Sequence, residues 1–318
     1  MRIVIAGAGA MGCRFGDALH RHGEDVVLVD GWHDHVAAIR DHGLQVTDDL
    51  GRHVSRIRAV TFDQVGELDA ADLVIVFGKA LQTAAIAEAC RPLTTGNTRV
   101  LTLQNGVGNV EAIEKVVHRE RIMAGVTTLG TELIGPGAIR ALGTGHTYLA
   151  KVDDGADEVL QRIVRVMAEA GLQAEYSSDV NRIIWAKVAF NCVLNALSAL
   201  IRVPVGKLSE YAQLDRLVSP LVDEVVAVAA AEGIRLPAGE VHTLLQDALD
   251  PTRAGSSHHL PSMLQDLLGG RPTEIDHLNG AVVRKGVQHG VPTPVNETMT
   301  HLIRLSEQLR ERQYWGTN

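Results

Sequence analysis

A glycine-rich segment close to the N-terminus is the feature that most constrains the fold. Gly7-Ala8-Gly9-Ala10-Met11-Gly12 directly follows the apolar run Arg2 to Ala6 and opens a helical pattern. A strand that turns into a helix through such a segment is typical of the first unit of a Rossmann domain, where the glycines admit a pyrophosphate. The alternative is a glycine-rich turn that binds another anion. The residues predicted to contact a dinucleotide are Gly7, Gly9, Ala10, Met11 and Gly12.

Strand-like and helix-like patterns alternate through the first half of the chain. The alternation predicts right-handed crossovers and a parallel sheet with helices on both faces. A composition of 46% hydrophobic but only 3% aromatic residues suits such a sheet, because buried parallel strands are built from aliphatic side chains. The predicted strands are Arg2 to Ala6, Asp25 to Asp30, Leu73 to Phe77, Arg99 to Leu103 and Ile122 to Val126.

The pattern changes after Gly135. Two further strands are predicted at Ala138 to Leu142 and His146 to Ala150, at the far edge of the sheet, with a helix near Asp157 to Ala170. Only helical periodicity follows Tyr176.

Helix start signals in the second half occur at Asp179 and Pro272, and a stop signal occurs at Gly290. The predicted fold class is an α/β Rossmann N-terminal domain with a parallel sheet, followed by an all-α C-terminal domain. The predicted boundaries are residues 1–175 for the dinucleotide-binding domain and 176–318 for a substrate and dimerisation domain.

Charge and cysteine content exclude several classes of protein. A formal net charge of −8 does not fit a general nucleic-acid binder, which needs a basic surface. The three cysteines are widely spaced and suggest neither a disulfide framework nor a zinc site. No segment is expected to span a membrane. We therefore expect a cytoplasmic protein that binds neither nucleic acid nor membrane.

Asp30 stands at the end of the second predicted strand, about twenty residues beyond the glycines. A carboxylate at that position accepts hydrogen bonds from the adenosine ribose hydroxyls and repels a 2′-phosphate. No Lys or Arg lies between Asp30 and Arg40 to offset that repulsion. The sequence thus favours NAD(H), without excluding NADP(H). The alternative is that Asp30 only caps the next helix.

Polar residues also follow the later strands. Lys79 comes after Leu73 to Phe77, and Asn105 comes after Arg99 to Leu103, so both are expected at the edge where a cofactor binds. Lys79 would contact a phosphate or a substrate carboxylate, and Asn105 would bind the nicotinamide ribose or carboxamide. Taken alone, Lys79 is more typical of a solvated loop, and Asn-Gly is an ordinary turn dipeptide. Only their shared position at the carboxyl ends of strands favours a role in binding.

A polar stripe runs along an otherwise apolar helical segment in the second half. Lys187, Asn191 and Asn195 recur every four residues and therefore share one helix face. A lysine among apolar neighbours must reach water or be held by acceptors. Reduction of a ketone places negative charge on the carbonyl oxygen, which an ammonium stabilises and protonates. We assign the role of general acid to Lys187, with the two asparagines orienting it and binding substrate. The alternative is a solvent-facing stripe.

A second group of polar residues extends from Ser256 to Glu274. Its adjacent histidines, His258 and His259, lack a suitably spaced third ligand, so no metal site is predicted. Ser262 is expected to bind a substrate carboxylate. Glu274 is expected early in a helix after Pro272, where it pairs with Lys187 or a substrate hydroxyl.

With these residues in view, the chain resembles the ketopantoate reductase (2-dehydropantoate 2-reductase) family from end to end. The matching segments are Gly7-x-Gly-Ala-Met-Gly12, Lys79, Gln104-Asn105-Gly106, Trp185-x-Lys187-x3-Asn191-x3-Asn195, Ser262-Met-Leu-Gln-Asp266 and Thr273-Glu274-Ile-Asp276. The resemblance implies reduction of 2-dehydropantoate to D-pantoate, with Lys187 as general acid. It also places Glu274 and Ser262 near the substrate, Glu274, Lys79 and Asn105 near the cofactor, and implies a homodimer.

Two departures from the family pattern leave the substrate open. Asp30 stands where members that prefer NADPH carry a basic residue nearby. His259 replaces an asparagine that commonly contacts the substrate three residues before Ser262, so we expect His259 to line the substrate site. Both features also resemble NAD-dependent D-2-hydroxyacid dehydrogenases of the D-mandelate type, which form the alternative. A non-catalytic dinucleotide sensor would lack the polar stripe.

Overall fold

The computed structural model describes residues 1–153, 155–250 and 260–309, and it divides into two compact units. The first unit comprises Met1–Gln104 and Gly108–Val180. The second comprises Asn105–Val107 and Asn181–Asn318, so that three residues of a loop in the first half are grouped with the helical second half.

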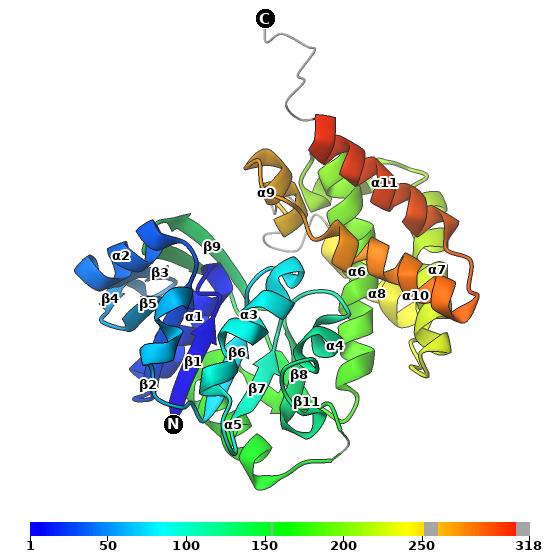
Figure 1. Ribbon diagram of the computed structural model, residues 1–318. Helices are drawn as coiled ribbons and strands as arrows, with labels where there is room; N and C mark the ends of the chain where they lie inside the picture. The colour runs from blue at the N-terminus through cyan, green and yellow to red at the C-terminus, as the bar shows by residue number, and fades with distance from the viewer. Residues whose placement is uncertain (154, 251–259, 310–318) are drawn as a thin grey trace, which may run out of the picture. The chain divides into compact units, whose positions relative to one another are not determined.

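An eight-stranded sheet forms the centre of the first unit (Figure 1). Its order is β12-β11-β8-β7-β6-β1-β2-β5, and every neighbouring pair is parallel except β11 and β8. The predicted parallel sheet is thus confirmed. Its strands are β1 (Arg2–Ala6), β2 (Asp25–Asp30), β5 (Arg58–Thr61), β6 (Leu73–Val76), β7 (Arg99–Thr102), β8 (Ile122–Thr127), β11 (Thr147–Lys151) and β12 (Ala174–Tyr176).

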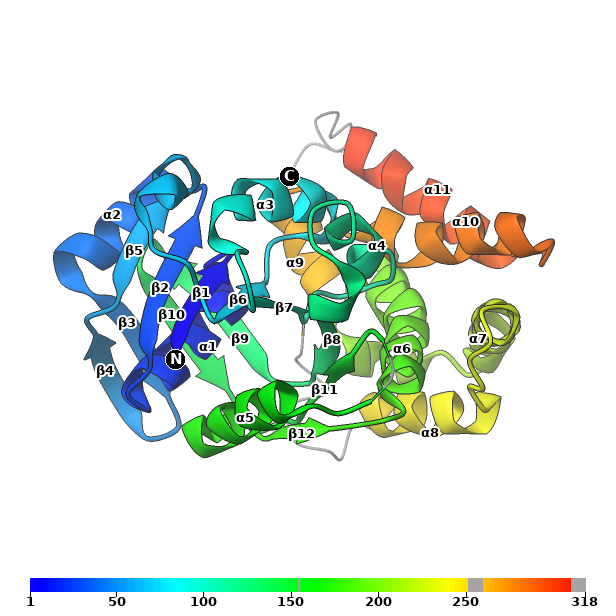
Figure 2. The ribbon, with the colours of Figure 1, turned by 60° about the horizontal axis from the view of Figure 1, so that its bottom comes forward.

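Helices cover both faces of this sheet (Figure 2). Successive side chains of β1 point to opposite faces, as in any strand. Ile3 and Ile5 join a buried cluster with Phe15 of α1, whereas Val4 joins a second cluster with Ile86 of α3. Burial on both faces explains why the strands are almost continuously apolar. The helices of this unit are α1 (Ala10–Arg21), α2 (His33–His42), α3 (Thr83–Ala89), α4 (Asn109–Ile113) and α5 (Glu158–Met167).

A second, four-stranded sheet was not predicted. It consists of β3 (Leu44–Asp48), β4 (Gly51–Ser55), β9 (Gly130–Gly135) and β10 (Ala138–Leu142), in the order β4-β3-β10-β9. The placement of Ala138 to Leu142 at the edge of the main sheet is therefore wrong. β10 pairs with β3 from far earlier in the chain, and such long-range pairing leaves no local signal in the sequence.

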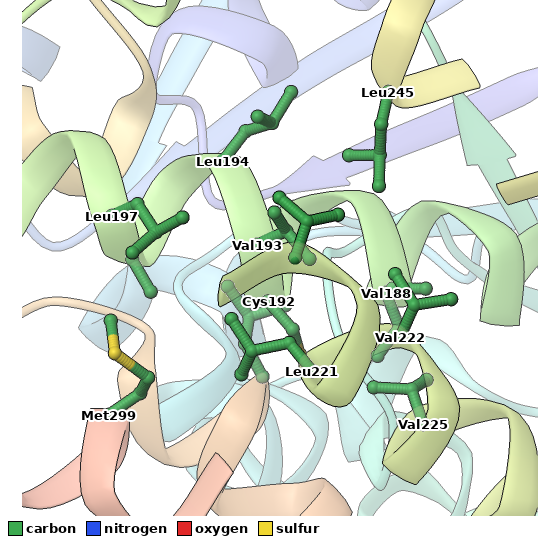
Figure 3. Close-up of a cluster of buried hydrophobic side chains, with 14 of the residues drawn as sticks. Val188, Cys192, Val193, Leu194, Leu197, Leu221, Val222, Val225, Leu245 and Met299 are labelled. Carbon is green, nitrogen blue, oxygen red and sulfur yellow. The ribbon is translucent and has the colours of Figure 1, made fainter. Parts of the chain in front are cut away.

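The second unit is all helical among its described residues, as expected. Buried side chains of the long helix α6 form its centre and face α7, α8 and α11 (Figure 3). The helices are α6 (Val180–Ile201), α7 (Asp215–Ala231), α8 (Ala238–Leu249), α9 (Ser262–Leu268), α10 (Asn279–His289) and α11 (Pro294–Leu309).

The length and apolar character of α6 differ from the expectation that no segment resembles a membrane span. Its mean hydropathy reaches 1.6 over a window long enough to cross a bilayer. However, 72% of that window is buried inside the protein. The apolar composition is accounted for by packing in the centre of the helical unit, because α6 is surrounded by other helices rather than by one neighbour.

Two of the three predicted helix boundaries are confirmed and one is wrong. Helix α6 begins directly after Asp179, and Gly290, with a left-handed φ of 68°, ends α10, as expected. The predicted start at Pro272 is wrong, because α10 begins at Asn279 and is preceded by a single 3₁₀ turn at Ile275–His277. Contacts with α11 hold this segment out of a regular helix. The Thr273 amide donates to Glu307 at 2.7 Å, and Arg304 donates to Asp276 at 2.8 Å.

Candidate active site

The strand order reverses at the boundary between β1 and β6 in the first unit. From β1 the chain proceeds to β2 and β5 on one side, whereas β6, β7 and β8 extend to the other. In open α/β sheets, ligands bind outside the carboxyl ends of the strands at such a switch point. Gly7 follows β1 there, and Gly78 follows β6.

The glycines of the first turn are required for two different reasons. Gly7 has a φ of +95°, and a Cβ atom on it would collide with the backbone of Gly78. A Cβ on Gly12 would collide with the carbonyl of Gly7. By contrast, a Cβ on Gly9 would meet nothing within 4 Å. The fold itself demands Gly7 and Gly12, whereas Gly9 leaves open space at the N-terminus of α1.

The open space beside Gly9 is where the pyrophosphate of a dinucleotide would lie. The N-terminus of α1 presents unpaired backbone N–H groups and the positive end of the helix dipole, both of which favour a pyrophosphate. The predicted residues Gly9 to Gly12 surround this helix end, whereas the Gly7 amide donates to the Val29 carbonyl at 2.8 Å, so Gly7 would contribute through the turn that it permits.

Asp30 lies at the carboxyl end of β2, beside Thr61 of β5. Its Oδ1 accepts a hydrogen bond from the backbone amide of Trp32 at 2.8 Å. This bond closes the turn that leads into α2. It also fixes the position of the carboxylate at the end of the strand. The N-cap residue of α2 is Trp32, and no side chain caps that helix, so the alternative that Asp30 caps it is not borne out. The bond within the turn leaves further acceptor sites of the carboxylate for the predicted ribose hydroxyls.

Gln104 organises the loops after β6 and β7, although we did not single it out as a site residue. Its amide Nε2 donates to the Gly78 carbonyl at 2.5 Å and to Thr83 at 2.8 Å. Lys79, which is partly buried, directly follows Gly78. The only sequence signal for this role was the position of Gln104 at the end of a strand, next to Asn105.

Asn105 contacts Glu274 in the second unit. The Asn105 side-chain amide lies 3.4 Å from Oε2 of Glu274, a carboxylate that is only 7% exposed. The neighbouring Gly106 has a φ of +85°, and a Cβ on it would collide with the carbonyl of His277. The Val107 amide donates to that same carbonyl at 3.3 Å. His277 is thus a further residue that sequence reasoning missed, and its backbone holds Asn105 against Glu274.

Lys187 lies on α6 and is partly buried. Burial, which disfavours the charged ammonium, lowers the pKa of Lys187 from 10.5 to about 8. The carboxylate of Glu274 opposes this shift, because a nearby negative charge favours the ammonium. The structure therefore brings Lys187, Glu274 and Asn105 together from three separate segments of the sequence.

The remaining predicted residues have different surroundings. Asn191 and Asn195 follow Lys187 along α6, and each is 5% exposed, which disagrees with the alternative of a solvent-facing stripe. Ser262 is exposed and is the first residue of α9. His259 lies outside the described residues.

Comparison with known proteins identifies the family. The family model described as ketopantoate reductase PanE/ApbA matches residues 3–154, and the corresponding C-terminal model matches residues 179–307. The chain belongs to the ketopantoate reductase family. A 2-dehydropantoate 2-reductase from Lactococcus lactis is 36% identical over 97% of this chain and 99% of the relative. One from Halobacterium salinarum is 32% identical over 96% and 99%.

Solved structures of the same fold include a D-mandelate dehydrogenase as well as ketopantoate reductases. D-mandelate dehydrogenase in complex with NADH and anilino(oxo)acetate is 37% identical, with a TM-score of 0.93 over 97% of this chain and 98% of that one. A PanE/ApbA family ketopantoate reductase from Ralstonia eutropha is 32% identical, with a TM-score of 0.88 over 98% and 100%.

The contrast between the glycines of the first turn gives a test of the dinucleotide site. We expect Gly9→Ala to leave the melting temperature unchanged and to weaken NADH binding by about tenfold or more, because the added methyl group occupies space that only the ligand needs. Fluorescence titration and thermal unfolding measure the two effects. Gly135→Ala, whose Cβ would also meet nothing within 4 Å, is the matched control and should change neither. Unaltered NADH binding by Gly9→Ala would contradict the assignment.

Proposed function

We propose that this chain reduces a small branched 2-oxo acid with NAD(P)H, with 2-dehydropantoate as the nominal substrate and D-pantoate as its product. The observation that carries the proposal is the partly buried Lys187 beside the buried carboxylate of Glu274. Membership of the ketopantoate reductase family and the full-length similarity to 2-dehydropantoate 2-reductases support it.

Lys187 is the proposed general acid. When bound, the reduced dinucleotide supplies the hydride that the carbonyl carbon accepts. Negative charge then grows on the carbonyl oxygen, where the ammonium of Lys187 stabilises it and donates the proton. A pKa near 8 suits this task, since the amine is charged at neutral pH yet releases its proton more readily than an ordinary lysine.

Glu274 and Asn105 form the proposed support of this lysine. The carboxylate favours the charged form of Lys187, and the Asn105 amide lies within 3.4 Å of one carboxylate oxygen. Asn191 and Asn195, which lie on the same face of α6, are proposed to orient the ammonium and bind the substrate oxygen. Ser262 and His259 are proposed to bind the rest of the substrate.

NADH is the proposed preferred cofactor. Asp30 stands where a 2′-phosphate would meet a negative charge. Arg40, the first Lys or Arg after it, is engaged elsewhere, because its guanidinium donates to the Ala59 carbonyl at 2.7 Å and to Gln64 at 2.5 Å. Lys79 is proposed to contact a cofactor phosphate or the substrate carboxylate.

A D-2-hydroxyacid dehydrogenase of the D-mandelate type is the second candidate. Asp30 favours it, and so does the similarity to D-mandelate dehydrogenase bound to NADH. The two activities share the reaction and the general acid, and differ in the side chain that the pocket accepts.

We further propose a cytoplasmic homodimer. All three cysteines, Cys13, Cys90 and Cys192, are buried free thiols, which suits a reducing compartment.

One assay separates the two candidates. Purified protein is given NADH or NADPH with 2-dehydropantoate, 2-oxoisovalerate or phenylglyoxylate, and the loss of reduced-cofactor absorbance is followed. We expect turnover of at least one of these 2-oxo acids, with a higher kcat/KM for NADH than for NADPH. The highest kcat/KM with 2-dehydropantoate supports the first candidate, whereas the highest with phenylglyoxylate supports the second. Failure to reduce any of the three overturns the proposed function.

The role of Lys187 is tested by substitution. We expect Lys187→Ala to lower kcat by a factor on the order of 10² or more while NADH binding persists, because the general acid is lost and the glycine turn is intact. Lys207→Ala is the control, since Lys207 is an exposed lysine of the same unit that pairs with Glu210, and it should retain full activity. A Lys187→Ala enzyme that keeps wild-type turnover would remove the role assigned to this residue.

The pKa of Lys187 predicts opposite pH profiles for the two reaction directions. Reduction needs the ammonium, so its kcat/KM should fall as the pH rises above about 8, whereas oxidation of the 2-hydroxy acid needs the free amine and should rise through the same range. Glu274→Gln removes a charge that raises the pKa of Lys187, so the midpoints of both pH profiles should move to lower pH. Midpoints that are unchanged in Glu274→Gln would show that a group other than Lys187 controls the pH profiles.

A further inference from the structure

Trp32 is an exposed aromatic residue in a chain with few aromatics. Only 3% of the residues are Phe, Trp or Tyr, yet the Trp32 side chain is 41% exposed. It lies two residues beyond Asp30, at the carboxyl end of β2, and its backbone amide donates to that carboxylate at 2.8 Å. The indole therefore lies beside the candidate ribose-binding carboxylate with part of its surface open to solvent.

A buried histidine supports the indole ring. The rings of Trp32 and His35 stack with centroids 5.3 Å apart and an interplanar angle of 11°. His35 is 1% exposed, and its Nδ1 accepts a hydrogen bond from the Gly137 amide at 3.0 Å. Burial lowers the pKa of His35 and so favours the neutral ring. The indole is therefore held against a fixed, uncharged support.

The same support extends to the glycine turn. Nε2 of His35 lies 3.4 Å from the Cys13 sulfur, and the Cys13 thiol donates to the Ala8 carbonyl at 2.9 Å. Ala8 lies inside the turn predicted to hold the pyrophosphate. Contacts thus run from that turn through Cys13 and His35 to Trp32.

A second aromatic residue lies beside the same strand end. Phe62 directly follows β5, the neighbour of β2 in the sheet. A Cβ on Gly31 would lie 3.7 Å from the Phe62 ring. Gly31, which carries no side chain, therefore leaves the backbone between Asp30 and Trp32 open toward an aromatic surface.

We propose that Trp32 forms the adenine-binding platform of this protein, stacking on the base of a bound adenine dinucleotide. In a Rossmann domain the adenosine half lies outside the end of the second strand, where Asp30 would hold the ribose. A flat aromatic base gains affinity by stacking on an indole. The inference rests on the dinucleotide of the proposed function, but it concerns only the adenine end, and it is tested without any 2-oxo acid.

Binding of cofactor fragments to the full chain tests the proposal. ADP-ribose contains the adenine but no nicotinamide, whereas nicotinamide mononucleotide contains no adenine. We expect Trp32→Ala to weaken ADP-ribose binding, measured by calorimetry, by about 5- to 150-fold, as loss of one stacked base predicts. Trp32→Phe should recover most of the affinity. Leu133→Ala, which truncates another 41% exposed side chain of the same unit, should bind ADP-ribose like the wild type. Nicotinamide mononucleotide binding should be the same in all variants.

Intrinsic fluorescence provides a second measurement. The chain has three tryptophans. Adenine that stacks on Trp32 should quench the fluorescence of that tryptophan, and this quenching should be lost in Trp32→Phe. Equal ADP-ribose affinity in the wild type and Trp32→Ala, or no ADP-ribose binding by the wild type, would overturn the inference. Weakened ADP-ribose binding in a protein that reduces none of the 2-oxo acids would support the platform and leave only the proposed reaction refuted.

Discussion

The chemistry proposed for this protein depends on one ammonium group held in a mostly apolar environment. Lys187 lies on a helix whose other side chains fill the centre of the helical unit, and its burial lowers its pKa to about 8. An isolated buried charge costs several kcal/mol, so such a lysine persists only with a compensating partner. Glu274 supplies that partner, and the Asn105 amide contacts the same carboxylate. A lysine on the protein surface would keep an ordinary pKa and would be a poorer proton donor.

The positions of these groups follow from backbone constraints rather than from the side chains alone. Gly106 allows its loop to touch the carbonyl of His277, since a Cβ there would collide with it. The tie between Arg304 and Asp276 holds the segment that follows Glu274. In the first unit, the turns after β1 and β6 approach one another closely because Gly7 carries no side chain. Close approach of backbone to backbone thus positions the glycine turn within the first unit and the contact of Asn105 with Glu274 within the second.

Much of the fold was predictable because its signals are local. The strands β1, β2, β6, β7 and β8 were expected within one residue of their observed ends, since buried parallel strands are short apolar runs separated by helices. The small sheet was missed because the pairing of β3 with β10 joins distant segments of ordinary polarity. The start of α10 was misplaced because Pro272 signals a helix locally, whereas Thr273 and Asp276 are held by α11.

The sequence by itself determined the glycine turn, the Rossmann and all-α organisation, and the residue types of the candidate site, because each depends on spacing along one element. It also placed Lys187, Asn191 and Asn195 on one helix face, since helical periodicity is a local property. Only the tertiary structure decided that Asn105 and Glu274 meet, that Gln104 ties together two loops, and that His35 supports Trp32. These contacts join segments far apart in the chain, and the folded packing, not the local pattern, sets which of them form.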